Sequence, residues 1–223
     1  MSVTSENTNN AFFTRVFDIG ANLGEYTELM LKKGANEVIA VEASTQLASI
    51  LSIAYRNNDK VKVLPKAASF NKNQVNLFLG SAHTISTANP DWILKSRFSK
   101  EYQWSAPVKI DAVTIDEMIE TYGVPDHIKI DVEGYELQVL LGLSKFVPCV
   151  ISFEWAEETK ENIARSLYYL KELGYTKYAY TLNHDNFEAF DGAYTDFASF
   201  VKPFLSSLDP ERKTEWGMIF VKP

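Results

Sequence analysis

The sequence predicts an α/β fold with a doubly wound, mostly parallel, seven-stranded sheet and helices on both of its faces. Apolar runs of strand length alternate with helix-forming segments along most of the chain. This alternation indicates a parallel sheet, because parallel strands are joined by crossover connections, which are usually helices. A glycine-containing turn after the first apolar run, Asp18–Gly24, supports the same fold, since doubly wound sheets bind ligands at such turns.

The first third of the chain predicts a βαβαβ unit. Gly34 follows two lysines and caps the first helix, and Ser44 is a suitable N-cap for the second. The predicted elements are strand Val16–Ile19, helix Glu25–Lys33, strand Glu37–Glu42, a helix from Ser44 to about Asn57, and strand Val61–Leu64.

A long irregular segment is predicted over residues 81–106. It follows a half-buried strand, Gln74–Gly80, in which apolar and polar residues alternate, and precedes a helix with a capping box at Thr114–Glu117 that ends at Gly123. A connection of this length is more often a lid or binding loop than a linker. We expect an excursion over a ligand site, carrying His83, Trp92, Arg97, Tyr102 and Trp104. The alternative is a surface excursion packed by its own aromatic residues.

The second half resumes the alternation of strands and helices. The predicted elements are strand His127–Asp131, helix Gly134–Leu143, strand Val150–Glu154, helix Lys160–Leu173 closed by Gly174, strand Tyr175–Thr181 and strand Trp216–Val221. Residues 182–213 are polar and aromatic, and Pro203 and Pro210 are expected to act as breakers. They predict a second loop excursion over the same edge of the sheet.

Composition restricts the class of protein. The 223 residues are 46% hydrophobic, which predicts one domain over residues 1–223, with residues 1–15 as a frayed N-terminal segment. A net charge of −7 argues against a nucleic-acid partner. The single cysteine, Cys149, lies in an apolar run and is expected to fill the core.

The polar N-terminus does not resemble a secretory signal, and no apolar stretch approaches the roughly 20 residues of a membrane span. We expect a soluble, cytoplasmic protein; the oligomeric state stays open.

Carboxylates follow four of the predicted strands, at Asp18, Glu42, Asp131 with Glu133, and Glu154. Ligands of doubly wound sheets lie outside the carboxyl ends of the strands, so these side chains should share one site. Glu42 is placed to accept hydrogen bonds from both hydroxyls of a ribose. The turn reads Gly-Ala-Asn-Leu-Gly rather than G-x-G-x-x-G, which disfavours a nicotinamide dinucleotide. It suits S-adenosylmethionine, whose cationic groups favour nearby carboxylates.

Two segments resemble the FkbM-type S-adenosylmethionine-dependent methyltransferases. Val16–Thr27 is similar to the family's D-x-G-A-N-x-G-x-x-T opening, and Ile128–Glu136 is similar to its I-K-x-D-V-E-G-x-E signature. The resemblance extends from about Val16 to Glu154. It implies a class I methyltransferase, Rossmann-like fold and methylation of a hydroxyl on a sugar or other small metabolite.

The same resemblance implies which residues bind the cofactor. The glycine turn would line the methionine part, Glu42 the ribose and the Ala67–Ala68 turn the adenine, while Asp131 would lie beside the transferring methyl. The predicted cofactor-binding residues are Asp18, Gly20, Ala21, Asn22, Gly24, Thr27, Glu42, Ala43, Ala67, Ala68 and Asp131.

A hydroxyl acceptor must lose a proton, and the sequence offers Asp131 as the first candidate base, then His184, with His83 as a third. No metal ligand is assigned. Asp131, Glu133 and Glu154 nevertheless have the oxygen chemistry of a divalent metal site, an alternative that a chelator would test. Glu133 is instead expected to stabilise the start of its helix or to point back to the glycine turn. The alternative function is a non-catalytic S-adenosylmethionine-binding or interaction protein on the same fold.

Overall fold

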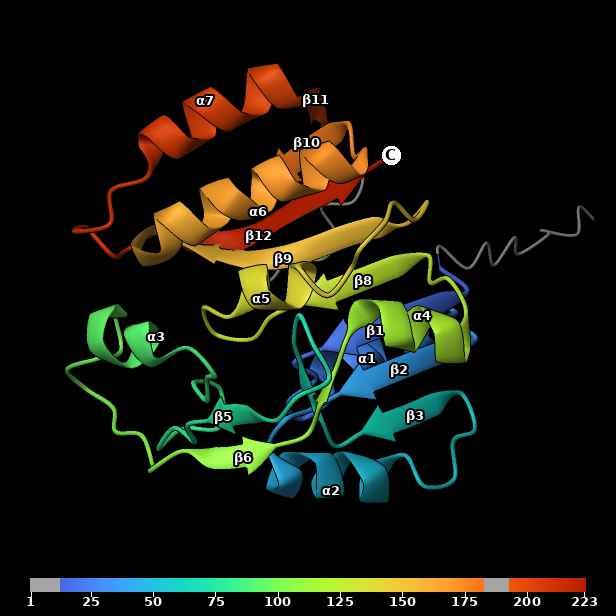
Figure 1. Ribbon diagram of the computed structural model, residues 1–223. Helices are drawn as coiled ribbons and strands as arrows, with labels where there is room; N and C mark the ends of the chain where they lie inside the picture. The colour runs from blue at the N-terminus through green and yellow to red at the C-terminus, as the bar shows by residue number, and fades with distance from the viewer. Residues whose placement is uncertain (1–12, 183–192) are drawn as a thin grey trace, which may run out of the picture.

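The computed structural model describes residues 13–182 and 193–223, and its main sheet has eight strands within those ranges. Their order across the sheet is β11-β10-β12-β9-β8-β1-β2-β3 (Figure 1). The strands are β1 (Arg15–Ile19), β2 (Glu37–Val41), β3 (Val61–Leu64), β8 (His127–Ile130), β9 (Val150–Ala156), β10 (Lys177–Tyr180), β11 (Thr195–Asp196) and β12 (Trp216–Lys222). The predicted count of seven is wrong by one, because β11 is a two-residue strand within the segment 182–213, which was expected to be a loop.

Five neighbouring strands, from β3 to β9, are parallel, and β12 runs antiparallel between β9 and β10. The chain moves outward from β1 to β3 and then returns to β8 on the other side of β1. The doubly wound prediction is therefore confirmed, and the order of strands reverses between β1 and β8. The carboxyl ends of these two strands flank the place where such sheets bind ligands.

Helices cover both faces of the sheet, as the alternation of side chains along the strands requires. Phe17 and Ile39 belong to a large core that also includes residues of α4 (Ile115–Tyr122), α5 (Glu136–Leu140), α6 (Lys160–Leu173) and α7 (Phe197–Ser207). Val16 and Val38 point to the other face, where they pack with Met30 of α1 (Glu25–Lys32). The helix α2 (Thr45–Ala54) adds Leu51 on that second face, beside Ala40 of β2. Cys149 is buried in the large core, as predicted.

Two small sheets accompany the main sheet. One pairs β4 (Ala67–Ala68) with β7 (Ala112–Val113), and the other pairs β5 (Val75–Leu77) with β6 (Val108–Ile110). The sheet formed by β5 and β6 lies beyond the carboxyl ends of β2 and β3, at the lower left of Figure 1. The strand predicted over Gln74–Gly80 thus exists only in part and outside the main sheet. It pairs with a segment that follows the long excursion, so its partner could not be identified from local pattern.

The two predicted excursions contain helices. Residues 81–106 include α3 (Pro90–Lys95), which begins with a side-chain cap from Asn89. Residues 182–213 include α7, and Pro203 lies inside this helix instead of breaking it. A proline inside a helix costs about 3 kcal/mol. Burial of Phe200, Val201 and Phe204 against the core offsets that cost.

The helix predicted over Gly134–Leu143 is shorter, because Glu133 and Gly134 have positive φ angles of 55° and 85°. These residues form a turn, and α5 begins only at Glu136. A further 3₁₀ turn, η1 (Glu157–Thr159), follows β9. No helix in the described ranges combines the length and apolar character needed to cross a membrane.

Candidate functional site

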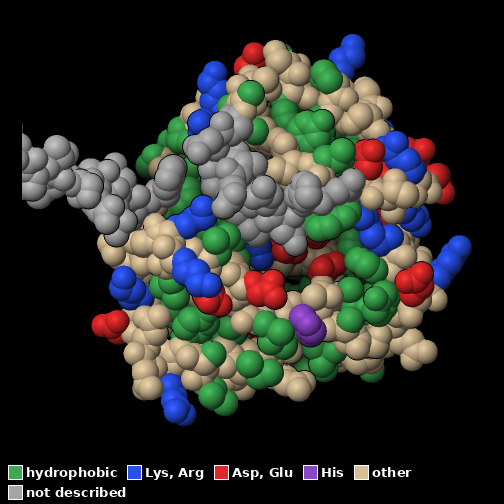
Figure 2. Space-filling view, turned by 180° about the vertical axis from the view of Figure 1, so that it is seen from behind, with side chains coloured by type: hydrophobic (Ala, Val, Ile, Leu, Met, Phe, Trp, Pro, Cys, Tyr) green, Lys and Arg blue, Asp and Glu red, His purple; other side chains and the backbone are tan. Residues whose placement is uncertain are grey.

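A cavity of about 550 Å³ opens at the carboxyl ends of the parallel strands, within the range of small-molecule sites. Figure 2 shows this face of the molecule hollowed at its centre, with acidic side chains in the hollow and a histidine on its rim. One end, here called the cofactor end, is lined by Gly20, Ala21, Asn22, Glu42, Ala43, Ala67 and Ala68. The opposite end, here called the far end, is lined by Trp92, Arg97, Phe98, Glu133, Glu154 and Trp216. Lys129 lines the cavity from β8, which lies in the sheet between β1 and β9, and Asp131 lines it from the residue after β8.

The glycine turn after β1 presents backbone to the cavity. Gly20, Asn22 and Gly24 all have positive φ angles, which favour glycine or asparagine. A Cβ on Gly20 would come within 1.8 Å of the Asp131 carbonyl oxygen, so only glycine fits between β1 and β8. The backbone N–H groups of Gly20 and Ala21 both donate to the carbonyl of Val41. These contacts fix the turn at the point where the strand order reverses.

Asp18 and Thr27 lie beneath this turn and are fully buried. The Thr27 hydroxyl donates to Asp18 Oδ2 at 2.6 Å. Asp18 Oδ1 has no hydrogen bond within the described ranges, but it lies 3.6 Å from Lys129 Nζ. Neither residue lines the cavity, nor does Gly24. Asp18 and Thr27 therefore support the turn from below, and Gly24 closes it by donating its N–H to the Ala21 carbonyl.

Glu42 follows β2 at the cofactor end and is nearly buried. Its two carboxylate oxygens accept backbone N–H groups from Asn22 at 2.8 Å and Ser44 at 2.7 Å. Burial raises the pKa of the Glu42 carboxyl, while these two hydrogen bonds act against the shift. Each oxygen keeps a further acceptor position, and the carboxylate is held rigidly. A carboxylate held in this way can accept hydrogen bonds from two neighbouring hydroxyl groups.

The turn after β8 carries three acidic residues with different partners. Asp131 Oδ2 lies 3.3 Å from Lys129 Nζ. Glu136 Oε1 accepts the N–H groups of Val132 and Gly134, so Glu136 caps this turn. The expectation that Glu133 stabilises the start of its helix is wrong, because its positive φ places it in the turn before α5. Burial, together with Asp131, raises the pKa of the Glu133 carboxyl.

The excursion over residues 81–106 packs on this same turn. The Thr87 hydroxyl donates to the Glu133 carbonyl at 2.7 Å, and the Asn89 amide donates to the Gly134 carbonyl at 2.8 Å. The ring of Trp92 packs so closely on Gly134 that a Cβ there would come within 2.8 Å of it. The far end of the cavity is therefore built by the excursion on the turn after β8.

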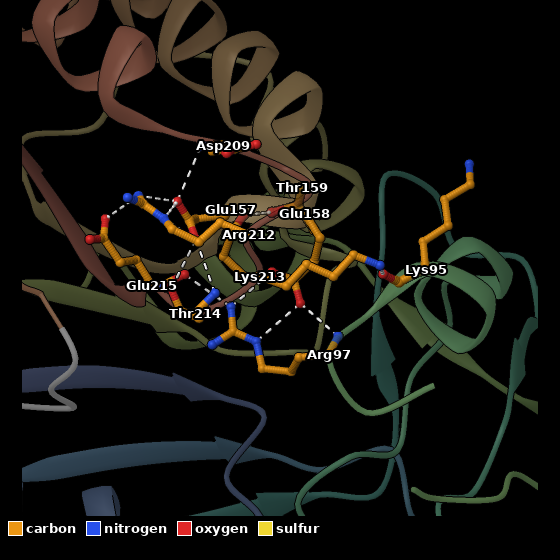
Figure 3. A network of polar contacts seen from close by, with 11 residues as sticks. Lys95, Arg97, Glu157, Glu158, Thr159, Asp209, Arg212, Lys213, Thr214 and Glu215 are labelled. Atoms are coloured by element: carbon orange, nitrogen blue, oxygen red, sulfur yellow. Dashed lines mark hydrogen bonds and ion pairs between the residues drawn. The ribbon is translucent and has the colours of Figure 1, made fainter. Parts of the chain in front are cut away.

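A polar network closes the far end (Figure 3). Arg97 donates through Nε and Nη2 to both carboxylate oxygens of Glu158, at 3.0 and 2.8 Å, and through Nη2 to the carbonyl of Glu215. The adjacent Glu157, which is fully buried, pairs with Arg212 and accepts the N–H groups of Asp209, Thr214 and Glu215. Burial opposes the ionisation of Glu157, but these hydrogen bonds outweigh it and lower its pKa to about 2. The network joins the excursion to the segment that leads into β12.

Three carboxylates meet near Asp131. Oxygens of Asp131, Glu133 and Glu154 lie within 4.8 Å of one another. Such oxygen ligands suit a divalent cation. The Lys129 ammonium faces the same group and attracts Asp131 and Glu154.

The structure brings most of the predicted cofactor residues together. Those that line one cavity are Gly20, Ala21, Asn22, Glu42, Ala43, Ala67, Ala68 and Asp131. His83 also lines it, and its Nδ1 lies 2.8 Å from the side-chain oxygen of Asn22. Trp104 does not line it and donates to the Ile85 carbonyl. His184, the second candidate base, lies outside the described residues.

Sequence reasoning missed Lys129, Trp216 and the capping role of Glu136. For Lys129 a signal was present, because the residue interrupts an apolar strand, Ile128–Ile130, two positions before Asp131. Side chains two apart in a strand point to the same face. A buried lysine there requires carboxylate partners. Trp216 reaches the cavity through a distant strand pairing with β9, which no local pattern reveals.

The sheet order, the glycine turn and the strand-end carboxylates define a Rossmann-like, class I methyltransferase fold. The methyltransferase FkbM domain model matches residues 18–177. The chain belongs to the FkbM methyltransferase family, and its cofactor is S-adenosylmethionine. A search of curated proteins finds no match.

Among solved structures, a precorrin-6y C5,15-methyltransferase from Geobacter metallireducens is similar, with 10% identity and a TM-score of 0.46 over 93% of this chain and 78% of that one. The methyltransferase domain of bacterial CtHen1-CN gives 10% identity and 0.46 over 95% and 91%. A putative hemolysin from Lactococcus lactis gives 14% and 0.45 over 94% and 78%.

The residues present fit this cofactor. Gly20 and Ala21 add nothing larger than a methyl group to the cavity wall, and the Glu42 carboxylate can accept hydrogen bonds from hydroxyl groups there. Ala67 and Ala68 add small apolar side chains to the lining. The carboxylate of Asp131 favours a cationic group nearby.

Proposed function

We propose that this chain methylates a hydroxyl oxygen on a small acceptor, such as a sugar or another hydroxylated metabolite. The proposal rests on one observation: the cavity continues past Asp131 to the far end, where carboxylates and aromatic rings face the same space. Carboxylates accept hydrogen bonds from hydroxyl groups, and the rings of Trp92, Phe98 and Trp216 offer flat apolar surfaces. Acidic lining and the net charge of −7 argue against a nucleic-acid acceptor.

In this proposal, the predicted cofactor residues act in two layers. Gly20, Ala21 and Asn22 line the amino-acid part, and Glu42 holds the ribose. Ala43, Ala67 and Ala68 form the adenine wall. Asp18, Gly24 and Thr27 fix the shape of the turn, since they do not line the cavity.

Bound S-adenosylmethionine supplies an electrophilic methyl group on a sulfonium. The protein's task is to hold the acceptor oxygen in line with it and to exclude water. As the carbon–oxygen bond forms and the carbon–sulfur bond breaks, the acceptor hydroxyl loses its proton. We assign Asp131 to receive this proton, because it lies between the cofactor end and the far end. His184 remains the second candidate.

Methyl-deuterated S-adenosylmethionine, mixed with a panel of sugars and other hydroxylated metabolites, tests this proposal by mass spectrometry and NMR. The expected product carries the label on oxygen. Asp131→Asn should lower transfer by about 10² to 10⁴ while largely keeping cofactor binding. Asp116→Asn, an acidic residue of α4, serves as the matched control and should leave transfer unchanged.

Label on nitrogen or carbon would contradict the oxygen assignment. Cofactor binding without transfer to any acceptor would favour the alternative, a non-catalytic binding or interaction protein on the same fold.

A further inference from the structure

Lys129 is a buried lysine at the centre of the site. It lies on β8 with only 4% of its surface exposed, and it lines the cavity. Its Nζ donates to the carbonyl of Gly20 at 3.1 Å. It also lies 3.3 Å from Asp131 Oδ2 and 3.6 Å from Asp18 Oδ1. One ammonium therefore joins the glycine turn to the carboxylates of two neighbouring strands.

This side chain carries a positive charge. Burial disfavours the ammonium form, but Asp131 and Asp18 outweigh burial and raise the pKa of Lys129 above its usual value. The ring of Tyr26 lies 5.8 Å from Nζ, a further contact that favours a cation. A permanently charged ammonium cannot take the proton of an acceptor. Its effect on the reaction must come through position and charge.

We infer that Lys129 is a positioning residue whose ammonium weakens binding of the sulfonium cofactor relative to its neutral thioether product. The inference rests on the proposed placement of the cofactor in this cavity. S-adenosylmethionine and S-adenosylhomocysteine differ at sulfur by a methyl group and one positive charge. A fixed ammonium in the same cavity repels that charge, and water screens it poorly because Lys129 is buried.

The Lys129 ammonium therefore keeps the site from binding S-adenosylmethionine too tightly. Without Lys129, Asp18 and Asp131 would be two uncompensated carboxylates, and both would attract the sulfonium. Tighter binding of the donor alone would lower the ground state without lowering the transition state. With Lys129 present, departure of positive charge from sulfur is favoured, so the ammonium assists the step that transfers the methyl group.

Calorimetric titration of both ligands tests the inference without an acceptor. Lys129→Met should raise the ratio of the S-adenosylhomocysteine Kd to the S-adenosylmethionine Kd by about tenfold. Lys129→Gln, which keeps a donor for the Gly20 carbonyl but loses the charge, should shift the ratio in the same direction. Lys129→Arg, which keeps the positive charge, should have a ratio close to that of the wild-type protein. Lys32→Met removes an equal charge from an exposed position on α1, outside the cavity, and should leave the ratio unchanged.

A ratio that stays at the wild-type value in both neutral variants overturns the inference, as does loss of both ligands in both variants, since Lys129 would then be purely structural. If the wild-type protein binds neither ligand, the cofactor placement itself fails, and the inference fails with it.

Discussion

The carbonyl oxygen of Asp131 lies directly against Cα of Gly20, leaving no room for a side chain between the first strand of the sheet and β8. We expect Gly20→Ala to abolish S-adenosylmethionine binding and to destabilise the fold by about 3 kcal/mol or more, because its Cβ would meet this oxygen at 1.8 Å. Calorimetry and thermal unfolding measure the two effects.

Gly174→Ala is the matched control for this variant. Gly174 also has a positive φ, of 114°, but its nearest neighbour is the ring of Phe146 at 3.4 Å, away from the cavity. The Gly174→Ala variant should be less stable than the wild-type protein but should still bind the cofactor. Equal cofactor affinity in both variants would contradict the role of the Gly20 turn.

Glu42→Ala should weaken binding of both S-adenosylmethionine and S-adenosylhomocysteine by about tenfold or more, because the ribose is common to both ligands. Glu42→Gln should lose less, since an amide oxygen can still accept one of the N–H groups of Asn22 and Ser44. Titration of both ligands measures these losses. An unchanged affinity would place the ribose elsewhere.

The folded-state pKa of Glu157, about 2, is below the ordinary value of 4.5. The ionised carboxylate therefore stabilises the fold above about pH 4.5, and this contribution is lost as the pH falls toward 2. We expect Glu157→Gln to cost about 2 kcal/mol at neutral pH. Denaturation at several pH values should show this difference shrinking below pH 4.5. Glu211→Gln, at an exposed position nearby, should show little difference at any pH.

Removal of divalent metal should leave both cofactor binding and methyl transfer unchanged, because Lys129 already supplies a cation to Asp131 and Glu154. Incubation with EDTA, followed by titration and transfer assays, measures this. Transfer that disappears with EDTA and returns with Mg²⁺ would instead make Asp131, Glu133 and Glu154 a metal site.

The parallel part of the sheet could be predicted from the sequence, because the patterns that indicate its strands and helix ends are local. Each strand there is an apolar run, and features such as Gly34, Ser44 and Gly174 mark helix ends that the structure confirms or places within a few residues. The strand-end carboxylates could be grouped for the same reason, since parallel strands place their carboxyl ends at one edge.

Features that depend on distant packing could not be predicted in this way. Pro203 signals a break, yet α7 continues because its aromatic side chains are buried in the core. The far end of the cavity joins Arg97 to Glu158, residues that come together only when the excursion packs on β9 and η1. Lys129 combines a local signal with distant packing. Its position in an apolar strand indicated a buried lysine, but its contacts with Asp18 and Gly20 depend on the pairing of β8 with β1.

A crystal structure with S-adenosylhomocysteine bound tests the central claim most directly. We expect the ligand in the cavity between β1 and β8, with its ribose hydroxyls on Glu42 and its sulfur beside Lys129 and Asp131. A ligand bound outside this cavity, or inside it with the ribose away from Glu42, would contradict the account.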